Sequence, residues 1–315
     1  MKDWLKPLGW GDAQISFLAG DASFRTYYRL VKGDETRVLM VAPPDFEKPA
    51  EYAQITQLLE KKGLSVPKIY HADLEQGFIL LEDFGDELYS RCLENGYNEE
   101  ELYEKAVDVL IHLHQNTSDE SGLPPYDKEK FLEEAQVFLD WAYPKKISVE
   151  LKNSYLTAWS NVYSQLPPMP QAIVLRDYMI DNILYLKDRP GIKACGLLDF
   201  QDALWGDVTY DLVSLLEDAR RDVSLGLAKK MLDRYLKAFP HISKDEFMHS
   251  YYAWGAQRST KIIGVFTRLA KRDNKPNYLR HVPRVWRILR KDLEHHALKP
   301  VKKWFDQHQA WGDVQ

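Results

Sequence analysis

The chain has 315 residues, a net charge of −5 at pH 7, 45% hydrophobic residues and 28% charged residues. This is the composition of a globular protein, and the length exceeds the roughly 250–300 residues at which single cores stop growing, so we expect two lobes. The negative charge balance argues against nucleic acid and anionic membranes as partners, and no apolar run reaches the ~20 residues of a membrane helix.

Cysteine usage and the N-terminus bear on the compartment. Cys92 and Cys195 are the only cysteines and lie far apart, so they suggest neither a metal cluster nor a disulfide framework. The first residues, MKDWLKPLGWGD, lack the apolar core of a signal peptide. We therefore expect a cytoplasmic protein.

Short strands dominate the segment 1–83. A strand at 16–18 ends at Gly20, the sequence GDASFRTYYRL runs into a second strand, and 38–42 forms a third. A helix is predicted at 49–62, followed by strands at 68–72 and 78–82. The turn that contains Gly20 and Ser23 can be a plain hairpin turn, or it can present backbone N–H groups to a phosphate.

Helices dominate the segment 84–315. Apolar periodicity predicts them at 99–115, 128–141, 148–166, 225–239, 244–270 and 277–296. Between them, short apolar runs at 172–175, 183–186 and 194–198 indicate buried strands. The sequence GDVTYDLVSLLEDARRDV predicts a loop followed by a helix, and Asp211 can cap that helix. We interpret Asp211 as a buried structural acid rather than as a metal ligand.

Three oxygen-bearing side chains lie where these short strands end. They are Asp177, Asn182 five residues later, and Asp199 at the end of the third run. Asp and Asn also serve ordinary turn chemistry, but hard oxygen ligands of this kind suit Mg²⁺, which fills its other positions with water and phosphate oxygens. The spacing matches protein kinases, in which a catalytic Asp precedes a metal-binding Asn and a later metal-binding Asp.

A kinase-like chain places its phosphate loop between the first two strands, which makes Gly20, Ser23 and Arg25 candidate nucleotide contacts. The third strand, VLMVAPP, has Met40 or Val41 where protein kinases carry a phosphate-binding lysine. The nearest replacement cations are Arg25, Arg29 and Lys32, and the helix Glu that pairs with such a cation could be Glu51, although a surface charge is the alternative. The sequence LLEDFGD would be the hinge between lobes, with backbone at Glu82 and Phe84 binding the adenine edge.

Several long motifs carry a resemblance to a known family. They are GDASFRTYYR, VLMVAPP, LLEDFGD, LRDYMIDN, LLDFQDALWGDVTYDLVSLLEDARRDV and AQRSTKIIGVFTRLAKRD. The chain resembles the aminoglycoside phosphotransferase and choline kinase family, and more narrowly the bacterial anomeric kinases of N-acetylmuramate and N-acetylglucosamine in cell-wall recycling. The resemblance implies an α+β fold of the bilobal protein-kinase type, with a small antiparallel β-rich N-lobe (1–83) and a larger, mainly helical C-lobe (84–315). Leu175 and Met179 depart from the residues common in relatives.

The resemblance also implies a small-molecule substrate, with an amino sugar favoured, together with cofactors and residue roles; we expect a monomer or weak dimer. ATP and Mg²⁺ would be the cofactors, with Asp177 accepting the proton of a sugar hydroxyl while Asn182 and Asp199 hold the metal ion. Asp202, Arg220 and Arg258 are candidates for contacts to sugar hydroxyls and the lactyl carboxylate, and salt bridges within the helical lobe are an equally open alternative. Two other functions remain open: a kinase for another small alcohol, such as an aminoglycoside or choline, and a non-catalytic binding protein.

Overall fold

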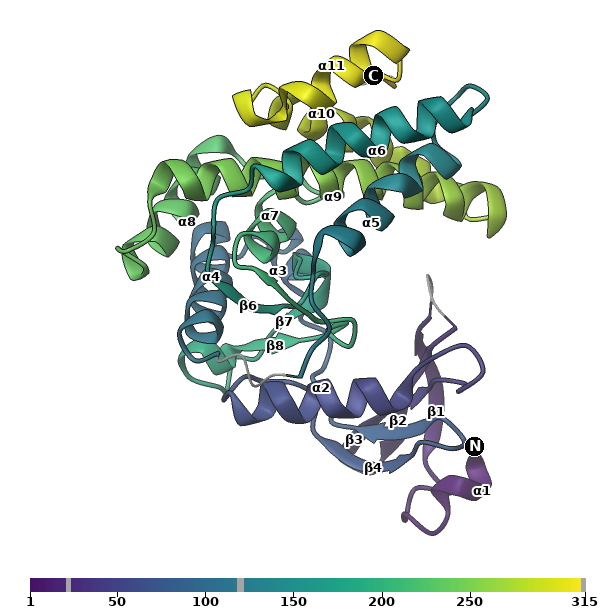
Figure 1. Ribbon diagram of the computed structural model, residues 1–315. Coiled ribbons are helices and arrows are strands. Elements are labelled where there is room, and N and C mark those ends of the chain that lie inside the picture. Colours follow the sequence, from purple (N-terminus) through teal and green to yellow (C-terminus); the bar gives the residue numbers. More distant parts are fainter. Residues whose placement is uncertain (21–23, 118–121, 313–315) are drawn as a thin grey trace. The chain divides into compact units, whose positions relative to one another are not determined.

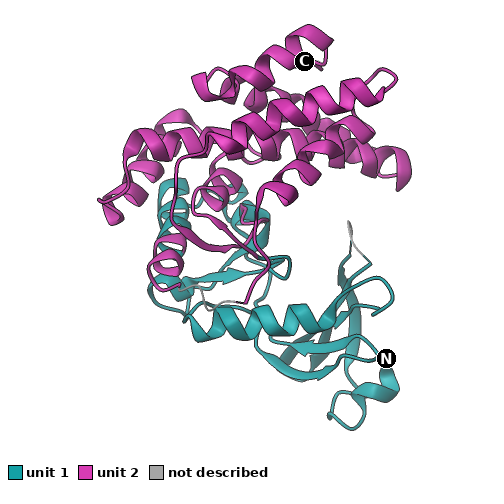
Figure 2. Cartoon of the chain, in the orientation of Figure 1, with its two compact units in different colours: residues 1–109, 180–203 teal, residues 110–179, 204–315 magenta. Residues whose placement is uncertain are grey.

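Two compact units make up the chain, which the computed structural model describes over residues 1–20, 24–117 and 122–312. Unit 1 consists of Met1–Val109 and Ile180–Ala203, and unit 2 of Leu110–Met179 and Leu204–Gln315 (Figure 2). The lobe boundary after residue 83 that the sequence suggests stays a prediction, and the segment 84–109 belongs to unit 1.

Unit 1 contains a five-stranded sheet in the order β1-β2-β3-β5-β4 (Figure 1). All of its neighbouring strands pair antiparallel. The strands are β1 (Gln14–Ala19), β2 (Thr26–Lys32), β3 (Glu35–Val41), β4 (Ile69–Asp73) and β5 (Phe78–Leu81). Gly77, in the turn before β5, has φ +73°, and a Cβ there would lie 2.0 Å from the Ala42 carbonyl oxygen, so only glycine fits. Each strand overlaps the one that the sequence predicts, and the antiparallel sheet is confirmed.

The sheet contributes to a small apolar core. Leu30, Leu39 and Leu80 form one buried cluster with Leu5 and Trp10 of the N-terminal segment, which includes helix α1 (Lys2–Leu5). Helix α2 (Pro49–Lys61) begins with proline, whose missing N–H costs nothing at a helix start, and it buries Tyr52, Ile55, Thr56 and Leu59. The Tyr52 ring stacks on Phe200 at 5.4 Å, which links α2 to the segment that follows β8.

A second β-structure in unit 1 is the antiparallel hairpin of β7 (Ile183–Tyr185) and β8 (Cys195–Leu197). Isolated bridges join Ser65 to Gly196 and Leu88 to Leu184, so both strands are tied to the chain that flanks the sheet. Helix α3 (Tyr89–Glu94) follows β5 in the sequence, and α4 (Glu99–Gln115) runs across the boundary between the two units at residues 109 and 110. The hairpin fixes the residues on either side of it, including Asn182 and Asp199.

Unit 2 is mainly helical. Its helices include α5 (Lys128–Trp141), α6 (Val149–Ser164), α7 (Tyr210–Leu216), α8 (Leu225–Ala238), α9 (Lys244–Arg272), α10 (Val282–Asp292) and α11 (Lys299–His308). A two-stranded ribbon of β6 (Gln171–Val174) and β9 (Leu204–Asp207) completes it. Helices α5 and α9 approach closely at Gly264, where a Cβ would lie 2.5 Å from the Val137 carbonyl oxygen. The predicted α+β class, with a mostly helical C-terminal part, is confirmed.

The C-terminal helix predicted at 277–296 is wrong as a single element. Over this range the structure has a 3₁₀ helix at Pro276–His281 and then α10 at Val282–Asp292, and a further helix that was not predicted, α11, follows at Lys299–His308. Proline lies in the first turn of each of these helices, which is where it is tolerated and where a new helix starts. Leu293 and Leu298 are buried in the break between α10 and α11, so packing favours a turn over a continued helix.

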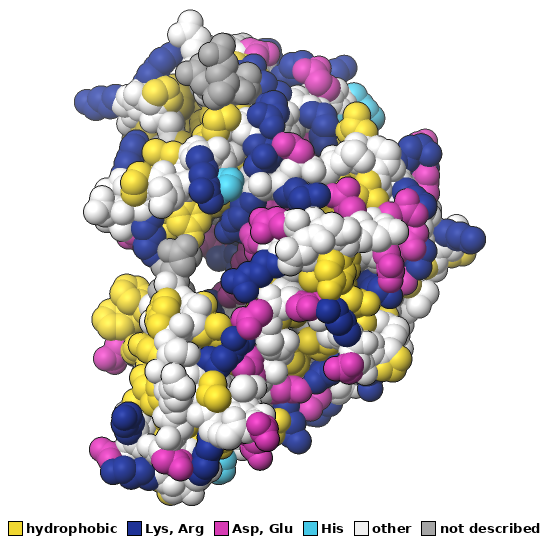
Figure 3. All heavy atoms as spheres, turned by 180° about the vertical axis from the view of Figure 1, so that it is seen from behind, with side chains coloured by type: hydrophobic (Ala, Val, Ile, Leu, Met, Phe, Trp, Pro, Cys, Tyr) yellow, Lys and Arg dark blue, Asp and Glu magenta, His cyan; other side chains and the backbone are white. Residues whose placement is uncertain are grey.

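The described surface carries both signs of charge. On the face drawn in Figure 3, side chains of Lys and Arg are interspersed with those of Asp and Glu. No helix within the described ranges combines the length and the apolar character that a membrane crossing requires.

Candidate functional site

The hairpin of β7 and β8 brings two of the predicted site residues together. Ile183 pairs with Leu197, and one step further the Leu198 N–H donates to the Asn182 carbonyl oxygen at 2.9 Å. Asn182 and Asp199 therefore flank the same open end of the hairpin. Asp199 has φ +55°, a left-handed conformation that non-glycine residues adopt at a cost and that gathers at functional sites.

Arg25 lies beside Asp199. Its Nη2 is 3.1 Å from Asp199 Oδ1, and its Nε is 3.5 Å from Glu47 Oε2. The Arg25 side chain is 11% exposed and that of Asp199 is 42% exposed, so the carboxylate stays open to further ligands. The second oxygen of Glu47 accepts a hydrogen bond from the Phe24 N–H at 2.8 Å. Glu47 was not among the residues predicted from the sequence.

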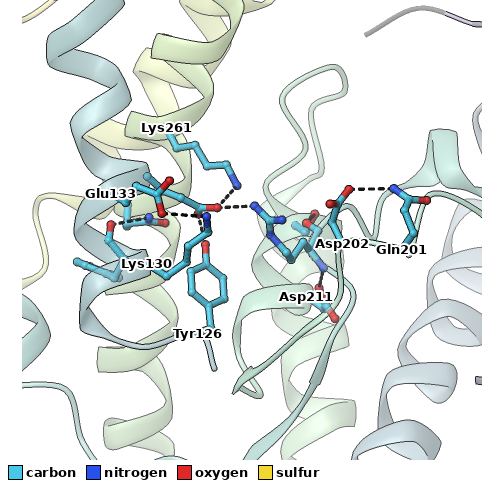
Figure 4. A network of polar contacts seen from close by, with 12 residues as sticks. Tyr126, Lys130, Glu133, Gln201, Asp202, Asp211 and Lys261 are labelled. Carbon is cyan, nitrogen blue, oxygen red and sulfur yellow. Dashed lines mark hydrogen bonds and ion pairs between the residues drawn. The ribbon is translucent and has the colours of Figure 1, made fainter. Parts of the chain in front are cut away.

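Gln201 links Asp199 to Asp202. Its Nε2 donates to Asp199 Oδ1 at 3.0 Å and to Asp202 Oδ2 at 2.9 Å, the second of these bonds being drawn in Figure 4. Arg25, Met40, Glu47, Gln201 and Asp202 help to line a pocket of about 210 Å³ within unit 1. The structure therefore places Asp202 with the hairpin, next to the predicted metal ligands.

The donor set suits a magnesium ion held together with a phosphate. Asp199 offers a carboxylate and Asn182 an amide oxygen, and Mg²⁺ usually takes only one or two protein carboxylates. Among the described residues, no group of three or more His, Cys, Asp or Glu side chains forms a complete metal cage. One carboxylate and one amide oxygen fit a metal ion whose remaining ligands are water and phosphate oxygens.

The predicted hinge residues lie in unit 1 near the same hairpin. The Glu82 N–H donates to the Lys68 carbonyl at 2.9 Å, and Glu82 Oε1 binds Arg189 Nη2 at 2.5 Å. The Phe84 ring lies against Gly196 of β8, where a Cβ would be 2.7 Å from Phe84 Cδ2. Arg29 is engaged here too, since its Nε binds Asp83 Oδ2 at 2.7 Å. Binding of an adenine edge by this segment stays a prediction.

In unit 2, Asp177 follows a backbone that is held tightly. Arg176 has φ +70°, and the Asp211 carboxylate accepts the N–H groups of Leu175 at 2.6 Å and Arg176 at 2.9 Å. Ser214 Oγ donates to the Arg176 carbonyl at 3.2 Å. Burial raises the pKa of Asp211 to about 7, against the opposing effect of the two backbone N–H groups. These contacts fix the direction in which the chain enters Asp177.

Asp211 is thus a buried acid, as predicted, but its predicted role as a helix cap is wrong. It lies inside α7, and Thr209 occupies the N-cap position. Its carboxylate bonds to the end of the segment before Asp177 instead, because that segment leaves two backbone N–H groups that need an acceptor.

A buried ionic network holds the Arg176 side chain. Glu134 on α5, which is 5% exposed, binds the Arg176 guanidinium, the Tyr126 hydroxyl and Lys261 Nζ, the last at 2.9 Å. In Figure 4, Lys261 and Tyr126 point toward the same carboxylate. The sequence contains one signal of this network, since Glu134 lies on the apolar face of its helix with Phe131, Ala135 and Phe138, all of which are buried.

The remaining predicted residues have distinct environments. Gly20 is described, whereas Ser23 lies outside the described residues. Arg220 Nη1 contacts Met179 Sδ at 2.7 Å, two residues after Asp177. Arg258 on α9 is 3% exposed, and its positive charge acts to lower the pKa of Asp211. This favours the alternative in which Arg258 is a charge partner inside the helical lobe. Its role toward a substrate stays a prediction.

Comparison with known proteins gives consistent matches over most of the chain. The model of the phosphotransferase enzyme family matches residues 14–247. A curated N-acetylmuramate/N-acetylglucosamine kinase from Caulobacter vibrioides is 34% identical over 344 residues, covering 97% of this chain and 94% of that protein. A kinase of the same name from Pseudomonas aeruginosa is 37% identical over 294 residues, covering 89% of this chain and 85% of its own length.

Solved structures agree on the fold. Choline kinase LicA from Streptococcus pneumoniae is similar with a TM-score of 0.66 at 14% identity, over 92% of this chain and 97% of that chain. A structure of LicA in complex with AMP is similar as well, with a TM-score of 0.64 at 14% identity. At this level of identity the similarity establishes the protein-kinase-like fold alone.

Proposed function

The chain belongs to the phosphotransferase enzyme family, and on this premise we propose that it is an ATP-dependent kinase for N-acetylmuramate and N-acetylglucosamine, acting at the anomeric hydroxyl. The observation that carries the proposal is the similarity to curated kinases of these sugars, at 34% and 37% identity over most of the chain. A role in recycling cell-wall sugars fits these substrates.

The β7–β8 hairpin supports the phosphate half of the reaction. Asn182 and Asp199 flank its open end and would hold Mg²⁺, which neutralises charge on the transferred phosphoryl group. Arg25, 3.1 Å from Asp199, adds a fixed positive charge beside them. The turn that contains Gly20 and Ser23, and the backbone at Glu82 and Phe84, would contact the rest of the nucleotide. The AMP complex of a protein with a similar fold supports a nucleotide site.

Asp177 would act on the acceptor. It would orient the anomeric hydroxyl and accept its proton, which is easier than for an ordinary alcohol because the anomeric hydroxyl is more acidic. Positioning matters most in phosphoryl transfer. The backbone contacts of Asp211 and Ser214 before Asp177 therefore support this assignment.

Arg220 is our candidate for recognition of the lactyl carboxylate that distinguishes N-acetylmuramate. Its guanidinium reaches Met179 Sδ at 2.7 Å and so lies near the Asp177 segment within unit 2. A planar guanidinium matches a carboxylate in two hydrogen bonds. Asp202 remains a candidate for contacts to sugar hydroxyls, and Arg258 is the weaker candidate because it is buried.

An acceptor panel tests the proposal. ADP release is followed with ATP, Mg²⁺ and N-acetylmuramate, N-acetylglucosamine, choline or kanamycin. A methyl glycoside of N-acetylglucosamine serves as the matched control, because its anomeric oxygen is blocked. We expect turnover with both free sugars and none with the glycoside. Turnover with choline or kanamycin alone would contradict the proposed substrate, and turnover of the glycoside would contradict the proposed position of transfer.

A further inference from the structure

The third strand of the sheet has no lysine where protein kinases bind the nucleotide phosphates. Its centre is Met40, which is 0% exposed and pairs with Tyr27 of β2 and Ile79 of β5. Met40 also helps to line the pocket that contains Arg25 and Asp202. Protein kinases use a lysine in this strand together with a Glu of the following helix. If the chain binds ATP as the proposed function requires, another cation would supply that charge.

Of the three cations that the sequence suggests as replacements, Arg25, Arg29 and Lys32, two are engaged elsewhere. Arg29 binds Asp83 Oδ2 at 2.7 Å and Asp86 Oδ2 at 2.8 Å, in the segment after β5. Lys32 binds the Gly9 carbonyl at 2.7 Å and Asp12 Oδ1 at 2.9 Å. Neither residue lines the pocket. Arg25 and Lys48 both do, but Lys48 pairs with Glu51 at 2.8 Å and its side chain is 74% exposed, whereas the Arg25 side chain is 11% exposed and its guanidinium contacts Asp199.

Glu47 is placed to act as the anionic partner of Arg25. One of its oxygens is 3.5 Å from Arg25 Nε, and the other accepts the N–H of Phe24 at 2.8 Å. A single carboxylate thus holds both the guanidinium and the backbone one residue before it, and the Glu47 side chain is only 13% exposed. Glu51, the Glu expected on the helix, instead pairs with Lys48 at 2.8 Å, with side chains 48% and 74% exposed.

We propose that Arg25 replaces the absent third-strand lysine as the cation that binds the nucleotide phosphates, and that Glu47 positions it. The proposal rests on the proposed function and adds to it the residue pair that binds the polyphosphate. A guanidinium suits the task because it presents several N–H groups in a fixed plane to phosphate oxygens. Its contact with Asp199 places that charge next to a proposed metal ligand.

Calorimetric titration with ATP–Mg²⁺ and with adenosine separates phosphate binding from base binding. We expect Arg25→Met to weaken ATP binding by about 10- to 100-fold, because a charge-assisted hydrogen bond to the phosphates is lost. Adenosine binding should stay unchanged, because adenosine has no phosphate. Arg25→Lys keeps the charge and should retain most of the affinity. In Arg25→Met, the added change Met40→Lys should restore part of it by returning a lysine to the third strand. Lys32→Met, which removes an equal charge away from the pocket, is the matched control.

Glu47→Gln tests the positioning role, because glutamine keeps an oxygen for the Phe24 N–H and removes only the charge. We expect a loss of ATP affinity of about 3- to 10-fold, with adenosine binding and the thermal midpoint unchanged. Equal ATP affinity in wild type and Arg25→Met would overturn the role of Arg25, and equal affinity in Glu47→Gln would overturn that of Glu47. If the wild type still phosphorylates the sugars, the proposed function survives either result. A wild type that neither binds ATP nor phosphorylates a sugar would overturn both proposals.

Discussion

The buried carboxylate of Glu134 should contribute about 3 kcal/mol to stability at neutral pH. Burial acts to raise its pKa, but Lys261, Arg176 and the Tyr126 hydroxyl outweigh that effect and lower the pKa from 4.5 to about 2. At about 1.4 kcal/mol per tenfold change in proton affinity, this difference corresponds to about 3 kcal/mol. Because the pKa is lowered on folding, the contribution is present above pH 4.5 and is lost as the pH falls toward 2.

Glu134→Gln removes the charge and keeps the size of the side chain. We expect the free energy of unfolding to fall by about 3 kcal/mol at about pH 7, since Arg176 and Lys261 would remain with an uncompensated positive charge. At about pH 3 the loss should be clearly smaller, because the carboxyl of the unfolded wild type, with a pKa near 4.5, is then protonated and stabilises the unfolded state, while the folded carboxylate stays mostly ionised.

Urea titration followed by tryptophan fluorescence measures both values. Glu133→Gln is the matched control on the same helix, because Glu133 makes an exposed ion pair with Lys130 at 2.9 Å, drawn in Figure 4, and such pairs contribute less than about 1 kcal/mol. A Glu134→Gln loss no larger than that of the control, or one of equal size at both pH values, would refute this reasoning.

Three further predictions concern single carboxylates. Asp177→Asn should lower kcat by at least ~100-fold while leaving the ATP dissociation constant unchanged, and turnover at the wild-type rate would exclude Asp177 as the base. Asp199→Asn should raise the Mg²⁺ concentration for half-maximal activity by about tenfold or more, and an unchanged requirement would exclude it as a ligand. Burial, followed by the negative charge of Glu217, raises the pKa of Asp292 well above 3.8. Ionisation of Asp292 therefore lowers the stability of the folded state as the pH rises above 3.8. Asp292→Asn should therefore raise the thermal midpoint by at least about 2 °C near pH 8 and by less near pH 4, and a midpoint lowered at pH 8 would contradict this sign.

Local signals in the sequence were sufficient for most element boundaries. Ser148, Ser224 and Ser243 each accept a backbone N–H from the first turn of the following helix, and all three helices were predicted within two residues of their starts. The strands at 183–186 and 194–198 were recognised because apolar runs stop at polar residues, and the same feature marked Asn182 and Asp199 as candidate site residues, which the hairpin brings together. Alternation and capping act over a few residues, so a sequence contains them directly.

Contacts between residues that are far apart in the sequence could not be predicted. Arg25 and Asp199 are 174 residues apart, and nothing local distinguishes Arg25 from Arg29 and Lys32 as the cation near Asp199. Glu47 follows a proline-rich loop and has no pattern around it that predicts an ion pair. The 3₁₀ helix at Pro276–His281 and α10 were merged into one predicted helix because a proline that starts a new helix looks the same in sequence as one that interrupts an amphipathic pattern. These features depend on the folded arrangement and not on spacing.

The most direct test of the central claim is a ³¹P NMR spectrum of the product formed from ATP, Mg²⁺ and N-acetylmuramate. We expect a new phosphomonoester signal that is coupled to the anomeric proton and absent when Asp177→Asn replaces the wild type. A phosphate signal coupled to another ring proton, or inorganic phosphate alone, would contradict phosphorylation at the anomeric hydroxyl.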